Sequence, residues 1–144
     1  MKPKEFISKL EENRIVTAIA AAEKQTSGEL RVWISDKART NALAAAKERF
    51  VKLGMQKTKN RNAVLLYFAP ASRQFAICGD IGVHEKCGDI FWKDIAGRME
   101  HFLKAEQYND AVEFALKEVG EVLARHFPRD PGDINELSDQ IVRD

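Results

Sequence analysis

Residues 62–69 read Asn-Ala-Val-Leu-Leu-Tyr-Phe-Ala, a nearly continuous apolar run. A run of this length that is rich in branched and aromatic side chains is typical of a β-strand covered on both faces. A strand with one solvated face would instead alternate between apolar and polar residues. The run therefore predicts the central strand of a sheet that is covered by helices.

Shorter patterns on either side of this run predict the rest of the fold. Residues 29–35 and 73–79 alternate as strands do, and the turn at 70–72 makes the second of them a hairpin partner of the central strand. Apolar residues recur at helical spacing elsewhere. The predicted helices cover residues 4–24, 41–53, 89–103 and 109–127.

The resulting order of elements is α-β-α-β-β-α-α. Two strands that are joined by a helix within one sheet normally run parallel, with a right-handed connection. The first two strands are therefore expected to be parallel and the third antiparallel to the second, which gives a small mixed sheet of the α/β class. One domain, residues 1–127, accounts for the whole pattern, because 144 residues is close to the commonest size for a single core.

The composition is that of an ordinary globular protein, with 44% hydrophobic residues, 31% charged residues and a net charge of +1. This near-neutral charge argues against nucleic acid as a partner. No apolar run approaches the roughly 20 residues of a membrane span. Charged residues also interrupt positions 5–12, where a signal peptide needs an unbroken apolar core. We therefore expect a cytoplasmic protein with no membrane partner, whose two cysteines are free thiols.

Residues 128–144 form a separate acidic C-terminal tail, which Pro128, Pro131 and Gly132 set apart from the domain. The tail carries five acidic and two basic residues. A few apolar residues within it could form a short helix that docks on the domain; these are Ile134, Leu137, Ile141 and Val142. A protein partner that recognises the acidic charge is one interpretation of this tail.

The expected strand directions bring polar residues to one edge of the sheet. These are Glu29 and Asn62 at the starts of the first two strands, Asp80 at the end of the third, and Glu85 and Asp89 in the loop that follows. Carboxylate and amide oxygens suit a hard cation such as Ca²⁺ or Mg²⁺, and the glycines of the predicted loop 79–89 would let it fold tightly. The alternative is structural: Asp89 caps a helix, Asp80 completes a turn, and Glu29 is a solvated strand end.

Several blocks of the sequence are similar to the TPM domain family, which is named after a thylakoid lumen protein, a photosystem repair protein and a receptor accessory protein. The blocks are residues 28–32, 62–66, 79–82 and 88–92, with Tyr108 and the last long helix after them, so the resemblance spans about residues 10–127. It implies a three-layer α/β/α sandwich, divalent-metal binding, and the acid phosphatase activity ascribed to some plant members. Many relatives carry a signal peptide and a membrane anchor after the domain, whereas this sequence continues into the acidic tail.

Two further groups of residues have chemical interpretations beside structural ones. Cys78, His84 and Cys87 match no common zinc pattern. Cys87 could act as a nucleophile with His84 as its base, because the start of the following helix would lower the pKa of the thiol. The sequence shows no third group that would orient these two. The alternative is two ordinary thiols.

A basic stretch between Lys47 and Arg61 could attract phosphate groups, or it could form a solvated helix face and loop.

The sequence therefore supports two functions that share a cation. The first is a binding module with an interaction or regulatory role, which holds Ca²⁺ or Mg²⁺ at the edge of Glu29, Asn62, Asp80 and Asp89. The second is a metal-assisted acid phosphatase acting on phosphomonoesters, in which Arg61 or a nearby lysine would steady the phosphoryl charge. Because the sequence supplies neither a recognisable nucleophile nor a fuller ligand set, we rank binding above catalysis.

Overall fold

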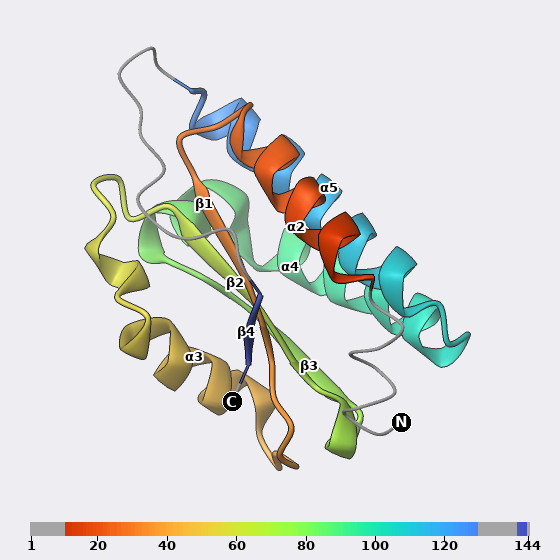
Figure 1. Ribbon diagram of the computed structural model, residues 1–144. Coiled ribbons are helices and arrows are strands. Elements are labelled where there is room, and N and C mark those ends of the chain that lie inside the picture. Colours follow the sequence, from red (N-terminus) through yellow and green to blue (C-terminus); the bar gives the residue numbers. More distant parts are fainter. Residues whose placement is uncertain (1–10, 130–140, 144) are drawn as a thin grey trace.

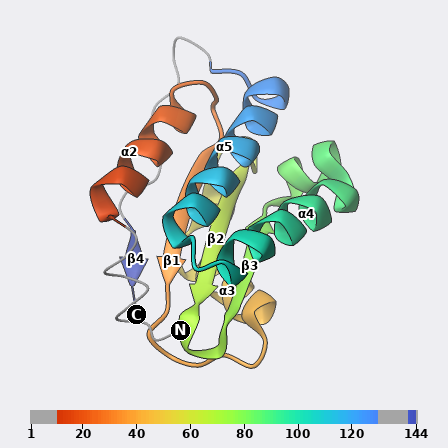
Figure 2. The same cartoon turned by 90° about the vertical axis from the view of Figure 1, so that its right-hand side faces the viewer.

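The computed structural model describes residues 11–129 and 141–143. Its elements in chain order are α2 (Glu12–Glu23), β1 (Glu29–Ile34), α3 (Ala42–Lys52), the short helix η1 (Met55–Lys57), β2 (Ala63–Ala69), the short helix η2 (Pro70–Ser72), β3 (Gln74–Gly79), α4 (Ile81–Lys104), α5 (Tyr108–His126) and β4 (Val142–Arg143). Helices α2, α4 and α5 cover one face of the sheet and α3 covers the other (Figure 1, Figure 2). The fold is thus the expected three-layer α/β/α sandwich.

The sheet has the strand order β3-β2-β1-β4. Strand β1 runs parallel to β2, with Glu29 beside Ala63, and β3 runs antiparallel to β2, with Gly79 beside Val64. Both directions agree with the sequence-based expectation. Every residue of β2 is at most 2% exposed, which confirms that the apolar run forms the central, doubly covered strand.

Alternation along the strands divides the apolar interior into two clusters. Leu30 of β1 and Leu66 of β2 face the three-helix layer, where Val119 of α5 belongs to the same cluster. Tyr67 of β2 faces the opposite side, where Phe50 of α3 packs in the second cluster. Because β2 contributes to both clusters, a polar residue in this strand would lose its hydration on either face.

The predicted loop 79–89 is wrong, because helix α4 begins at Ile81. Asp80 caps this helix: its Oδ1 accepts a hydrogen bond from the Ile81 N–H at 2.7 Å. The helix changes direction at Gly88, whose φ of 75° and ψ of 171° lie in a region that is essentially limited to glycine. The glycine that suggested a loop therefore marks a kink between two helical segments.

The end of the chain adds a strand that the sequence did not predict. Val142 and Arg143 pair in parallel with the end of β1, and Ile141 packs in the larger apolar cluster. At Val142 the chain is thus a strand and not part of the expected docking helix. Ile134 and Leu137 lie outside the described residues, and so do residues 4–10 of the first predicted helix. Within the described ranges, no helix has both the length and the apolar composition needed to cross a membrane.

Candidate functional site

The structure brings the backbones of three predicted site residues together at one edge of the sheet. The Glu29 N–H donates to the Asn62 carbonyl at 3.3 Å, and the Asp80 N–H donates to the Ala63 carbonyl at 2.9 Å. All three residues are buried, with exposed fractions of 2% for Glu29, 1% for Asn62 and 6% for Asp80. The expectation that strand direction would gather these residues is therefore confirmed for their backbones.

The Asp80 carboxylate is held by an arginine as well as by the helix it caps. Arg61 donates from Nε to Oδ2 at 2.7 Å and from Nη2 to Oδ1 at 2.8 Å. These hydrogen bonds, together with the charge of Asp80, raise the pKa of Arg61. The aspartate side chain is 5% exposed and the arginine side chain 50% exposed, so the carboxylate is buried whereas the arginine side chain is in contact with solvent.

Asn62, the next residue after Arg61, contributes a buried amide. Its Nδ2 donates to the Ser27 Oγ at 3.3 Å, and its backbone N–H donates to the Thr58 Oγ1 at 3.3 Å. Its Oδ1 is shielded from solvent and has no hydrogen-bond partner in the part of the chain that the structure describes. An amide oxygen in that state costs free energy, because it has lost water and gained no donor.

The side chains are less closely grouped than the backbones. In the strand register Glu29 lies beside Ala63, whose side chain faces α3, whereas Asn62 precedes Ala63 by one residue and its amide reaches Ser27. Within residues 11–129 and 141–143, no three His, Cys, Asp or Glu side chains form a group that could hold a metal ion. A cation at this edge would therefore depend on amide and water oxygens as well as on carboxylates.

The two remaining predicted ligands lie on α4. Glu85 is exposed in its first segment. Asp89 follows the kink, and its Oδ1 is 3.4 Å from the Nε2 of His84, with 74% of the Asp89 side chain exposed. Among the described residues neither makes an ion pair with the edge residues. The structure thus separates Glu85 and Asp89 from the buried edge.

Gly82 fixes the distance between α4 and the residues that precede β2. Its N–H donates to the Arg61 carbonyl at 2.9 Å. A Cβ at this position would lie 2.5 Å from the carbonyl oxygens of both Asn60 and Arg61. Only glycine allows this approach, so Gly82 positions Asp80 against Arg61.

The cysteines are both free, as the sequence predicts. Burial raises the pKa of the Cys87 thiol, and burial is also the largest cause of the raised pKa of Cys78. The expectation that a helix start would lower the pKa of Cys87 is wrong, because burial raises this pKa. A raised pKa keeps a thiol protonated near neutral pH, which disfavours a cysteine nucleophile.

The basic stretch after β1 is partly used for packing. Lys47 and Lys52 are exposed on α3, but the Arg49 guanidinium lies 5.3 Å from the centre of the Trp33 ring. Trp33 itself is 4% exposed. Lysines on this face, rather than Arg49, are the groups available to an anion.

Comparison with known proteins supports the fold over most of the chain. A family model described as the TPM domain matches residues 1–122. The NMR structure of BA42 protein from the psychrophilic bacterium Bizionia argentinensis is 34% identical, has a TM-score of 0.86, and matches over 93% of this chain and 92% of that one. The N-terminal domain of a protein from P. gingivalis is 15% identical with a TM-score of 0.64 over 82% of this chain and 76% of that one, and shows the fold alone. No protein with a curated description matches the chain.

Proposed function

Because the chain belongs to the TPM domain family, we propose that it is a binding module that holds a divalent cation, Ca²⁺ or Mg²⁺, at the edge of Glu29, Asn62 and Asp80. The observation that carries this proposal is the buried Asn62 Oδ1, which has no hydrogen-bond partner among the described residues and lies at the same edge as two buried carboxylates. Buried polar atoms are normally satisfied. Hard cations are bound by this mixture of carboxylate and amide oxygens, with water completing the shell.

The cation would compete with Arg61 for Asp80. The guanidinium pairs with the carboxylate in the absence of metal. Because the arginine side chain is half exposed, its displacement by a cation would not require the edge to unfold. A divalent ion in its place would be coordinated by the Asp80 oxygens. It would also give the Asn62 Oδ1 the partner that this atom lacks among the described residues. Glu85 and Asp89 are exposed on α4, so we assign them at most an outer role, through bound water.

Calorimetric titration with Ca²⁺ and with Mg²⁺ tests this site. Asp80→Asn and Arg61→Gln both break the same ion pair, but only Asp80→Asn removes a ligand. We expect wild type to bind at least one ion, Asp80→Asn to lose at least about tenfold in affinity, since a ligand charge is gone, and Arg61→Gln to bind as well as wild type or better. Thermal unfolding of both variants checks that each is folded.

Two results would end the proposal: wild type that takes up neither ion, or equal affinity in wild type and Asp80→Asn. A loss of affinity in both variants to the same extent would mean that the ion pair maintains the fold of the edge, and would remove Asp80 from the ligand set.

The interaction role belongs to the same proposal. Release of Arg61 would place a free guanidinium beside the exposed Lys57 and Lys59, so cation binding would alter the charge that this end of the molecule offers to a protein partner. A partner that recognises the acidic tail, residues 128–144, and a cytoplasmic location remain parts of this proposal.

A metal-assisted phosphatase is the second candidate, and the observation that favours it is the name of the matching family model, which includes the word phosphatase. In this version Arg61, once displaced from Asp80, would steady the phosphoryl charge. Hydrolysis of p-nitrophenyl phosphate should then require the cation and fall at least about tenfold in Asp80→Asn. Turnover that continues unchanged in the presence of EDTA, or in Asp80→Asn, would contradict the metal-assisted reaction.

A further inference from the structure

Strand β3 lies at one end of the sheet (Figure 2), and its own sequence lacks the features that usually protect such an edge. Edge strands normally carry lysine, proline or a bulge that prevents pairing with another chain. Strand β3 reads Gln-Phe-Ala-Ile-Cys-Gly, with no charge and no proline, and it pairs with β2 through six consecutive positions without a bulge. At the other end of the sheet, β4 is only two residues long and includes Arg143.

The alternation of hydrogen bonds between β2 and β3 shows which backbone groups of β3 face away from β2. The Asp80 N–H bonds to the Ala63 carbonyl, and in an antiparallel pair the residues that bond to the partner alternate with those that do not. Phe75 and Ile77 therefore direct their N–H and C=O groups away from β2. Within residues 11–129 and 141–143, no turn, loop or cap hydrogen bond uses these groups.

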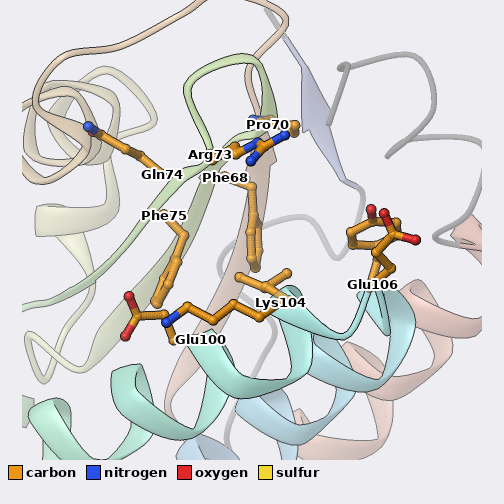
Figure 3. Close-up of a pocket in the computed structure, with 10 residues that line it drawn as sticks. Phe68, Pro70, Arg73, Gln74, Phe75, Glu100, Lys104 and Glu106 are labelled. Carbon is orange, nitrogen blue, oxygen red and sulfur yellow. The ribbon is translucent and has the colours of Figure 1, made fainter.

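A cavity of about 360 Å³ adjoins the start of this edge. Phe68 and Phe75 point from the sheet toward α4, where Glu100 and Lys104 lie across the opening (Figure 3). A second hollow of about 320 Å³ continues from Phe75 and Glu100 to the start of α3. The two hollows share Arg73, Gln74, Phe75 and Glu100, so together they follow the first residues of β3 between α3 and α4.

The rim of the cavity is charged. No ion pair in the described part of the chain involves its four charged residues, which are Arg73, Glu100, Lys104 and Glu106. An apolar centre with a polar rim is the usual anatomy of a protein interface.

We propose that the open edge of β3 binds an extended peptide segment of a partner protein, which adds to the sheet as a further strand. Main-chain hydrogen bonds to Phe75 and Ile77 hold the segment, and one apolar side chain enters the cavity beside Phe68 and Phe75. Successive side chains of a strand point to opposite faces, so its neighbour enters the hollow toward α3. Pairing of this kind gives affinity through the backbone and specificity through alternate side chains. The proposal goes beyond the cation site and does not depend on it.

Selection from a phage-displayed library of random decapeptides tests this surface. The enriched peptides are then synthesised in two N-methylated series, each methylated at every second residue but in opposite phase, and their binding is measured by fluorescence polarisation. One series should bind at least tenfold more weakly than the unmodified peptide, because its methyl groups replace the N–H groups that face β3, and the other should bind almost unchanged. Phe75→Ala should weaken binding at least tenfold, whereas Phe102→Ala, a half-buried aromatic outside the cavity, should not.

Strand addition would be overturned by a library that yields no enriched peptide, or by two methylated series that bind alike. Light scattering of the free protein tests whether a second copy of this chain occupies the edge instead. A dimer that Phe75→Ala dissociates would assign the edge to a second copy of this chain and overturn the peptide partner. Because Phe75 also contacts the core, thermal unfolding of its variant accompanies each measurement.

Discussion

Replacing Gly82 with alanine is expected to lower the free energy of unfolding by about 3 kcal/mol. The added methyl group would lie 2.5 Å from the carbonyl oxygens of Asn60 and Arg61. Both are backbone atoms, so no side-chain rotation can relieve the clash. The first turn of α4 would have to move away from the residues before β2, and the hydrogen bond from the Gly82 N–H to Arg61 would be lost.

Gly97→Ala is the matched control, because Gly97 lies in the same helix with nothing within 4 Å of its added Cβ. Alanine has the higher helix propensity, so this variant should gain about 1 kcal/mol. Urea denaturation of both variants and wild type gives the comparison. If Gly82→Ala were as stable as wild type, the close approach of α4 to residues 60–61 would be wrong, and with it the position of Asp80.

Leu66→Ala is expected to cost about 2–5 kcal/mol of unfolding free energy. Leu66 lies in the middle of β2, has no exposed surface and belongs to the larger apolar cluster. Truncation removes buried methyl groups and leaves a cavity that the surrounding strands and helices can fill only in part.

Leu43→Ala provides the control for this truncation, because Leu43 is 47% exposed on α3. The same chemical change should there cost less than about 0.5 kcal/mol. Denaturant unfolding of both variants measures the difference. Equal costs at the two positions would contradict the central place of β2, on which the strand order and the site both depend.

The sheet could be predicted from the sequence because its signals are local. The apolar run at residues 62–69 has no solvated face, and the strands beside it alternate, so burial alone identifies the central strand. Strand directions then follow from the helix between the first two strands. Strand β4 could not be found in this way, because two residues carry no periodicity and their pairing with β1 is a long-range contact.

The start of α4 cannot be predicted from residues 79–89 alone, because two signals there conflict. The glycines and acidic residues there are typical of a loop, yet Asp80 followed by Ile81 is also a capped helix start. The second reading is correct, since Gly82 is needed for a close approach and Gly88 for a kink. Neither requirement is visible without the neighbouring segments.

The candidate site was predictable in its location but not in its contacts. Strand direction placed Glu29, Asn62 and Asp80 at one edge, as observed. The pairing of Asp80 with Arg61 does not follow from the sequence pattern. The antiparallel register of β2 and β3 puts Asp80 opposite Ala63, two residues after Arg61, and the long arginine side chain spans the remaining distance. Register and side-chain reach decide such contacts, and the sequence pattern gives only the register.

Titration of the full chain with Ca²⁺, followed residue by residue through its NMR amide signals, tests whether the buried edge binds the cation. We expect the largest shifts at Glu29, Asn62 and residues 80–82, with saturation at a single affinity. Shifts confined to the acidic tail, residues 128–144, or to the exposed acids of α4 would contradict this expectation and leave the buried edge without a ligand role.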